Sequence, residues 1–216
     1  QLEVRQGETM VILGGSGSGK STLLRLMIGS LRPDAGRVTL FGRDLASLRE
    51  EELNEIRKRF GILFQSGALF NSMTLAENVA LPLREHTDLP RELIEIQVKI
   101  KLELVGLREH ADKLPSQISG GMRKRVGLAR AIVGEPQILL YDEPVTGLDP
   151  VNTATVEHLI TEIAEHRGVT SIVVTHDIEG ALIISDRVAL LDHGRLRFVG
   201  KPDEFRASQD PLVRAF

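Results

Sequence analysis

The glycine-rich stretch GGSGSGKST, residues 14–22, is the feature that most limits what this chain can fold into. An apolar run at 9–13 precedes it, and the helical pattern STLLRLMIGSL follows from residue 21. The stretch matches the pattern G-x-x-x-x-G-K-[ST], whose fixed positions are Gly14, Gly19, Lys20 and Ser21. A strand, a glycine-rich turn and a helix in this order surround phosphate oxygens with backbone N–H groups and a helix N-terminus. The sequence therefore predicts a phosphate-binding loop in an α/β fold.

The loop predicts ATP and Mg²⁺ as ligands. Lys20 is expected to reach the β- and γ-phosphates, and Ser21 to offer its hydroxyl to the metal. A flexible Gly/Ser linker is the alternative interpretation, but a linker has no reason to stand between a strand and a helix. The residues expected to bind the nucleotide are Gly14, Gly15, Ser16, Gly17, Ser18, Gly19, Lys20, Ser21 and Thr22.

Strand-like and helical patterns alternate along the chain, which favours a mostly parallel sheet covered on both faces. Helical patterns at 151–166 and 177–184 separate the last strands. Residues 66–133 are mostly helical, so we expect a core of 1–65 and 134–216 with this block as a helical subdomain. The strand-like runs are 9–13, 37–42, 61–65, 137–142, 170–175 and 187–191.

Two pairs of residues have the spacing of a capping box, which begins a helix. Ser47 with Glu50 predicts a helix start near residue 47, and Thr74 with Glu77 predicts another near residue 74. Pro82 is expected to end the short helix that Thr74 begins.

Polar side chains follow three of the predicted strands. Because the carboxyl ends of parallel strands bind ligands in open α/β sheets, we expect Asp142 to hold Mg²⁺ and Glu143 to orient or deprotonate the attacking water. His176 is expected to contact the γ-phosphate or that water, and Gln65 to contact Mg²⁺ or the water. A surface turn before Pro144 and an ordinary amide at residue 65 are the alternatives. The remaining histidines are expected to be structural or solvated: His86, His110, His158, His166 and His193.

A second helix start able to bind phosphate lies at Ser119, Gly120 and Gly121. Since residues 14–22 already form one cradle, a second one suggests a nucleotide shared between two copies of the chain. The basic residues that follow could indicate nucleic-acid binding, but we expect Arg123 and Lys124 to lie on a solvated or salt-bridged face.

These motifs, in this order, resemble those of the nucleotide-binding subunit of an ABC transporter over nearly the whole chain. The motifs are Walker A at 14–21, the Q-loop at Gln65, the signature at 118–122, Walker B at 138–143, the D-loop with Asp149, and the H-loop at His176. The resemblance implies a RecA-like P-loop NTPase fold with a small antiparallel β part. It also implies a head-to-tail homodimer that binds two MgATP, with Asp149 at the nucleotide site, and that drives transmembrane permease subunits.

Two positions depart from this family pattern. Met122 stands where the signature usually has glutamine, although the Ser-Gly-Gly expected to meet phosphate is intact. The family stacks adenine on an aromatic residue upstream of Walker A, and none of the residues before Gly14 is aromatic. We therefore expect a chain truncated at its N-terminus.

A finer resemblance is to the Mla- and Mce-associated lipid-trafficking ATPases, carried by residues 64–90, the SGGM signature and the tail DPLVRAF. It implies phospholipid or another hydrophobic molecule as cargo, with a lipid-carrier protein as a possible further partner. The expected location is peripheral, on the cytoplasmic face of the inner membrane.

Composition and length weigh against other functions. The formal net charge of −3 argues against a protein that binds nucleic acid through its overall field. No apolar run approaches the roughly 18 residues needed to cross a bilayer. The segment between Gln65 and Ser119 is too short for the coiled coil of ABC-type DNA-repair ATPases, and the ribosome-acting class joins two cassettes where this chain has one. Glu143 and His176 argue against a binding module that has lost hydrolysis.

Overall fold

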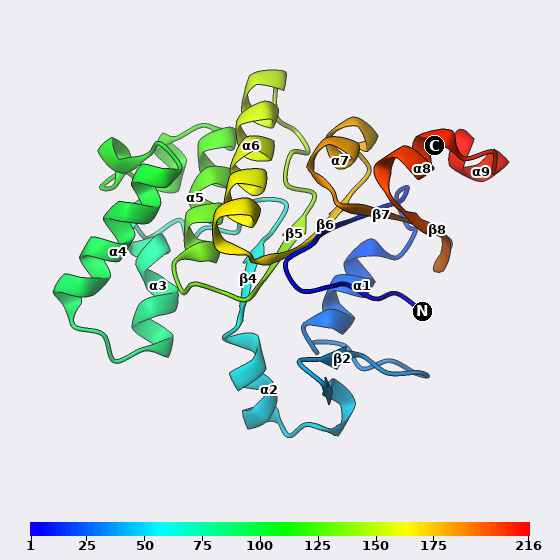
Figure 1. Cartoon of the computed structure of the whole chain (residues 1–216). Coiled ribbons are helices and arrows are strands. Elements are labelled where there is room, and N and C mark those ends of the chain that lie inside the picture. Colours follow the sequence, from blue (N-terminus) through cyan, green and yellow to red (C-terminus); the bar gives the residue numbers. More distant parts are fainter.

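The computed structural model describes the backbone of residues 1–216 and the side chains of 1–165 and 168–216. A six-stranded sheet forms the centre, in the order β4-β5-β6-β1-β7-β8, and only β8 runs antiparallel to its neighbour (Figure 1). The strands are β1 (Thr9–Leu13), β4 (Phe60–Leu63), β5 (Ile138–Asp142), β6 (Thr170–Thr175), β7 (Arg187–Asp192) and β8 (Arg195–Gly200).

Alternate residues of β1 enter two different hydrophobic cores, one on each face of the sheet. Val11 and Leu13 pack in the larger core, which α5 (Gly120–Ile132), α6 (Pro150–Arg167) and α7 (Ile178–Ile184) help to form. Met10 and Ile12 pack in the second core with α1 (Lys20–Met27). Figure 1 shows α1 on one side of the sheet and these three helices on the other. Helices therefore cover both faces, as the alternation in sequence predicted.

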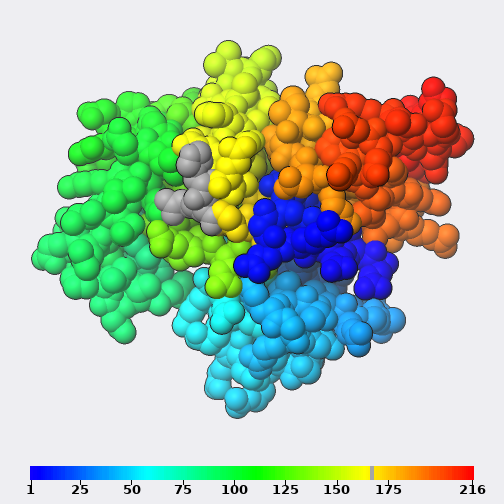
Figure 2. Space-filling model, viewed as in Figure 1, coloured from blue at the N-terminus to red at the C-terminus, as the bar shows by residue number. Residues whose placement is uncertain are grey.

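Three helices of the block at 66–133 pack against one another. These are α3 (Leu75–His86), α4 (Arg91–Leu104) and α5, joined by the 3₁₀ turns η2 (Arg108–His110) and η3 (Pro115–Gln117). Figure 2 shows them, in green, on one side of the molecule, with the segment from β7 onward on the opposite side. Because α5 also packs on β4, this helix joins the block to the sheet.

Smaller elements complete the fold. A two-stranded antiparallel sheet, β2 (Thr39–Leu40) with β3 (Arg43–Asp44), leads through η1 (Leu45–Ser47) into α2 (Glu50–Arg57). The chain ends in α8 (Pro202–Ala207) and α9 (Pro211–Arg214). None of the described helices has both the length and the apolar composition that crossing a membrane requires.

Two local predictions near α2 are wrong. The strand expected at 37–42 is only two residues long, because the chain turns back at Phe41 and Gly42, both with positive φ, to pair β2 with β3. Ser47 does not cap α2: its hydroxyl donates to the Asp44 carbonyl. The helix begins instead at Glu50, where the Glu52 carboxylate accepts from the Arg49 backbone N–H at 3.1 Å.

Pro82 does not end the helix that Thr74 begins, so that prediction is also wrong. It lies inside α3, which continues to His86. A proline in a helix costs about 3 kcal/mol through its lost hydrogen bond and its ring clash. Val79, Ala80 and Leu83 are buried on the same helix, and their burial offsets this cost.

The capping box at the start of α3 is confirmed. The Thr74 hydroxyl accepts from the Glu77 N–H at 3.2 Å, and the Glu77 carboxylate accepts from the Thr74 N–H at 2.7 Å. Thr74→Ala should therefore lower the free energy of unfolding by about 1 kcal/mol. Ser47→Ala, at the position that does not cap a helix, is the matched control and should change it by less. Urea denaturation measures both, and an equal loss in the two variants would contradict the assigned caps.

Candidate functional site

The parallel strands bring the predicted site residues to one edge of the sheet. Leu13 at the end of β1 is in register with Thr175 at the end of β6, and Asp142 of β5 with Val174. The phosphate loop, Glu143 and His176 directly follow these three ends. Gln65 follows the end of β4, next to β5, and is exposed.

The phosphate loop closes tightly at its first glycine. A Cβ on Gly14 would lie 2.5 Å from both the Leu191 carbonyl oxygen and the Ser18 hydroxyl, so no larger residue fits. Gly17 and Gly19 have φ values of 77° and 105°, in the left-handed region that glycine adopts without strain. The chain can therefore turn through this loop and enter α1 directly at Lys20.

The Lys20 ammonium is held across the loop. It donates to the carbonyls of Gly14 at 2.6 Å and Gly15 at 3.1 Å, and lies 3.4 Å from a carboxylate oxygen of Glu143. The side chain is almost fully buried. This places a cation at the start of α1, where the helix macrodipole also favours an anion.

The donors around the loop fit phosphate. The Ser18 hydroxyl is buried and has no hydrogen-bond partner among the described residues. Gly19 is the N-cap of α1. Because glycine has no side chain, the N–H groups of the first turn are not capped by this residue. Ser16, Gly17, Ser21 and Thr22 are exposed and accessible to a ligand.

Glu143 is held by more groups than any single motif predicts. One carboxylate oxygen accepts from the hydroxyls of Thr146 at 3.0 Å and Thr175 at 3.2 Å and lies 2.9 Å from His176 Nδ1. Burial alone would raise the pKa of this carboxyl. The hydrogen bonds from His176 and Thr146 and the Lys20 charge outweigh that effect and hold the pKa below its usual value. The carboxylate is therefore ionised at neutral pH.

The pKa of Asp142 is shifted in the opposite direction. Its half-buried position, and then the charge of Glu143, raise the pKa of its carboxyl, and the charges of Lys20 and Arg25 only partly oppose this. A carboxylate in this environment is stabilised by a cation. Among the described side chains, no three acidic or histidine groups gather closely enough to form a metal site alone. A metal at Asp142 would therefore need oxygens from other groups, such as Ser21 and phosphate.

The predicted second phosphate-binding helix start does begin a helix, α5. The Ser119 hydroxyl caps it by accepting from the Met122 N–H at 3.2 Å, and Ser119 and Gly120 are exposed. Gly121 is buried against Asn152, whose side chain would lie 2.5 Å from an added Cβ. The described contacts of these residues do not reach the phosphate loop of the same chain.

Asp149 caps α6, and Asn152 links it to the start of α5. Its carboxylate accepts from the N–H groups of Val151 and Asn152, and from the Asn152 side chain at 2.5 Å. Asn152 therefore connects Asp149 with the glycine start of α5, a link that sequence reasoning missed.

Among the side-chain predictions, the one for Lys124 is the most clearly wrong. It is buried, with 5% exposed, and its ammonium donates to the carbonyls of Glu143 at 3.0 Å and Thr146 at 2.8 Å. Arg123 is half-buried and donates to the Ile118 carbonyl. The spacing gave a signal: Lys124 is three residues after Gly121 and four before Leu128, on one buried helix face.

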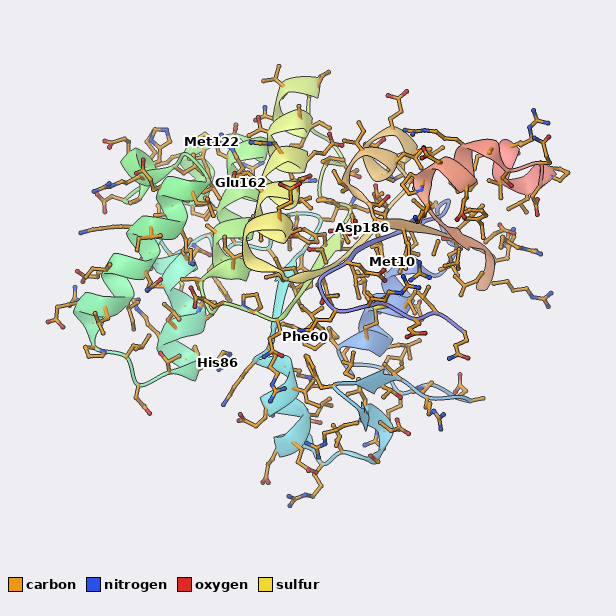
Figure 3. All side chains as sticks on the ribbon, in the orientation of Figure 1. Met10, Phe60, His86, Met122, Glu162 and Asp186 are labelled. Atoms are coloured by element: carbon orange, nitrogen blue, oxygen red, sulfur yellow. The ribbon has the colours of Figure 1, made fainter. Side chains whose placement is uncertain are left out.

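The remaining histidines are expected to be structural or solvated, and those whose side chains the structure describes are exposed or half-buried. His86, at the far end of α3 in Figure 3, is exposed, as are His158 and His193. His110 is half-buried in η2. The side chain of His166 lies outside the described residues. Met122, at the start of α5 in Figure 3, packs partly buried against the larger core.

Comparison with known protein families identifies the chain. Residues 1–146 match the family described as "ABC transporter". The chain belongs to the ABC transporter family. This family of ABC-type ATPases uses nucleotide.

Curated relatives match this ABC cassette over its full length. The Haemophilus influenzae protein "Intermembrane phospholipid transport system ATP-binding protein MlaF" is 45% identical, and the chain spans 81% of it. The Escherichia coli K12 protein of the same name is 44% identical, with 80% spanned. The "Probable ribonucleotide transport ATP-binding protein mkl" of Mycobacterium leprae is 46% identical, but the chain spans only 62% of its length.

Solved ABC cassettes share the fold. A dimeric post-hydrolysis state of the ATP-binding cassette MJ0796 bound to ADP and Pi has a TM-score of 0.85 and 33% identity, covering 93% of this chain and 88% of that one. The cassette cbiO1 of Clostridium perfringens has a TM-score of 0.88 and 31% identity, covering 99% and 84%. The predicted mostly parallel P-loop fold is confirmed.

Lys20→Ala should weaken ATP binding roughly 10–150-fold, the range expected when a hydrogen-bonded cation facing an anion is lost. Lys99→Ala, an exposed lysine of α4, is the matched control and should bind ATP as the unmodified chain does. Equilibrium binding of a fluorescent ATP analogue measures both. Unchanged affinity in Lys20→Ala would contradict the phosphate role of this lysine.

Proposed function

We propose that the chain binds MgATP between two copies of itself and hydrolyses it to power phospholipid transport by a partner permease. The observation that carries this proposal is the contact of the Glu143 carboxylate with both Lys20 of the phosphate loop and His176 at the end of β6. The 45% identity to MlaF supports the cargo.

The ATP phosphates would lie in the loop formed by residues 14–22, where Lys20 would exchange its carbonyl partners for phosphate oxygens. Asp142, Ser21 and Gln65 would hold Mg²⁺ together with the phosphates, and the metal would supply neutralising charge as the terminal phosphate leaves. The raised pKa of Asp142 supports this, because burial leaves its carboxylate in need of a cation.

Glu143 would act on the attacking water. Its lowered pKa keeps the carboxylate ionised, so that it orients the water through a hydrogen bond and accepts its proton as the bond to phosphorus forms. His176 would hold Glu143 in place and contact the terminal phosphate.

A second copy would complete each site. The exposed helix start at Ser119, Gly120 and Gly121 would face the ATP bound by the other copy, and Asp149 would lie beside it. The dimeric arrangement of MJ0796 supports this pairing. Residues 66–133 would move as the helical subdomain against the core of 1–65 and 134–216.

The permease would dock beside Gln65 and residues 66–90 and would hold the ATPase peripherally at the cytoplasmic face of the membrane. A lipid-carrier protein would belong to the same complex. The exposed Phe64 and Phe70, 43% and 50% accessible, support a docking surface here.

The cargo is tested by reconstituting the chain with its membrane partner in liposomes. ATP should drive transfer of labelled phospholipid, and an ATP-free sample is the control. Stimulated movement of a ribonucleotide, the cargo in the name of the mycobacterial relatives, with no lipid transfer would contradict the phospholipid proposal.

Glu143→Gln should leave ATP affinity intact and lower turnover by about 10²–10⁴-fold, the usual effect of a lost acid–base group. Glu109→Gln, an exposed carboxylate outside the site, is the matched control. Phosphate release under saturating MgATP measures turnover. Undiminished hydrolysis in Glu143→Gln would exclude this residue as the base.

Ser119→Ala should spare ATP binding by the single chain and weaken ATP-driven dimerisation by roughly tenfold or more, because a hydrogen bond to phosphate is lost. The comparison is made in a Glu143→Gln background, where bound ATP persists, by analytical ultracentrifugation. Ser116→Ala, exposed in η3, is the matched control and should dimerise normally. Equal dimerisation of both variants would refute the role of Ser119.

A further inference from the structure

Lys124 connects α5, the helix that begins after Ser119, with Glu143, the proposed catalytic base. It lies on the second turn of α5, and its buried ammonium donates to the backbone carbonyls of Glu143 and Thr146 at 3.0 and 2.8 Å. No motif recognised in the sequence assigns a role to this side chain.

The backbone that Lys124 holds is strained. Glu143 has a φ of 48°, in the left-handed region, which a residue with a Cβ adopts only when its surroundings impose it. Its N–H donates to the Val174 carbonyl at 2.9 Å on one side, and its carbonyl accepts from Lys124 on the other. The peptide groups on both sides of Glu143 are therefore fixed, which sets the direction of the side chain.

The second acceptor reinforces this effect. The Thr146 carbonyl accepts from the Lys124 ammonium, and the Thr146 hydroxyl donates to the Glu143 carboxylate at 3.0 Å. One ammonium thus fixes both the backbone of Glu143 and a hydrogen-bond donor to its carboxylate.

Burying this cation is costly, and among the described side chains it forms no ion pair. Burial lowers the pKa of Lys124 to about 8, and Glu143 is the charged group that partly opposes the shift. An apolar side chain of similar length would fill the same space without that cost. The retained ammonium is therefore best explained by the two carbonyls that it holds.

We infer that Lys124 is a positioning residue for ATP hydrolysis, which fixes the Glu143 loop and ties it to the helix that begins at Ser119. This rests on the proposed function, in which Glu143 is the base. Movement of α5 when Ser119 meets the second nucleotide is then transmitted to Glu143 of the same chain through one side chain.

The test compares Lys124→Met, which removes the donors, with Lys124→Gln, which keeps an uncharged N–H donor. Lys124→Met should lower kcat at least tenfold while KM and the affinity for ATP change less than threefold. Lys124→Gln should recover a substantial part of kcat. Circular dichroism and thermal unfolding establish that both variants fold.

The pH profile gives a readout that a purely structural role would not change. The protonated ammonium is the better donor, so kcat of the unmodified chain should hold at neutral pH and fall as the pH rises through about 8. This alkaline fall should be absent in Lys124→Gln, which has no proton to lose there.

The Glu143→Gln variant, measured in the same assay, distinguishes failure of this inference from failure of the proposed function. If Glu143→Gln loses turnover and folded Lys124→Met keeps kcat within twofold of the unmodified chain, the positioning role is overturned. An equal rise of KM with the fall of kcat, or no recovery in Lys124→Gln, also overturns it. If Glu143→Gln keeps full turnover, the proposed function fails first.

Discussion

The carboxylate of Glu143 is the point at which the separate parts of this molecule meet. It accepts hydrogen bonds from the loop after β5 and from the end of β6, and it forms an ion pair with Lys20 at the start of α1. These contacts are possible only because β5, β6 and β1 are adjacent and parallel, so that their carboxyl ends meet at one edge. The strand order thus brings together residues more than a hundred positions apart.

The sequence predicts the regular parts of the fold and the residues at the strand ends. The boundaries of β1 and β6 and the Thr74–Glu77 cap are read correctly, because each depends on local periodicity or on a fixed spacing. Pro82 and Lys124 are misread because tertiary burial overrides local preference at both positions. Nothing near Lys124 in the sequence indicates that its partners are the carbonyls of residues 143 and 146. The strand β8 and the helices after it are missed. β8 alternates between exposed and half-buried residues and has no fully buried one, so it lacks the continuous apolar run that marks the buried strands.

The exposed helix start at Ser119 and the buried lysine five residues later give α5 two functions in this account. Its N-terminus is accessible to a second copy, whereas its second turn holds the loop that carries Glu143 of its own chain. A single rigid helix can therefore relate two nucleotide sites without a long chain of intermediates. The close packing of Gly121 on Asn152, next to Asp149, adds a second connection at the same surface.

The central claim, that each nucleotide is bound between two copies, is tested most directly by the structure of the Glu143→Gln chain with MgATP. The account predicts a closed pair in which Ser119 of one copy lies within hydrogen-bond distance of the terminal phosphate of the ATP that Lys20 of the other copy binds. A closed pair in which Ser119 faces solvent, away from any nucleotide, would contradict it.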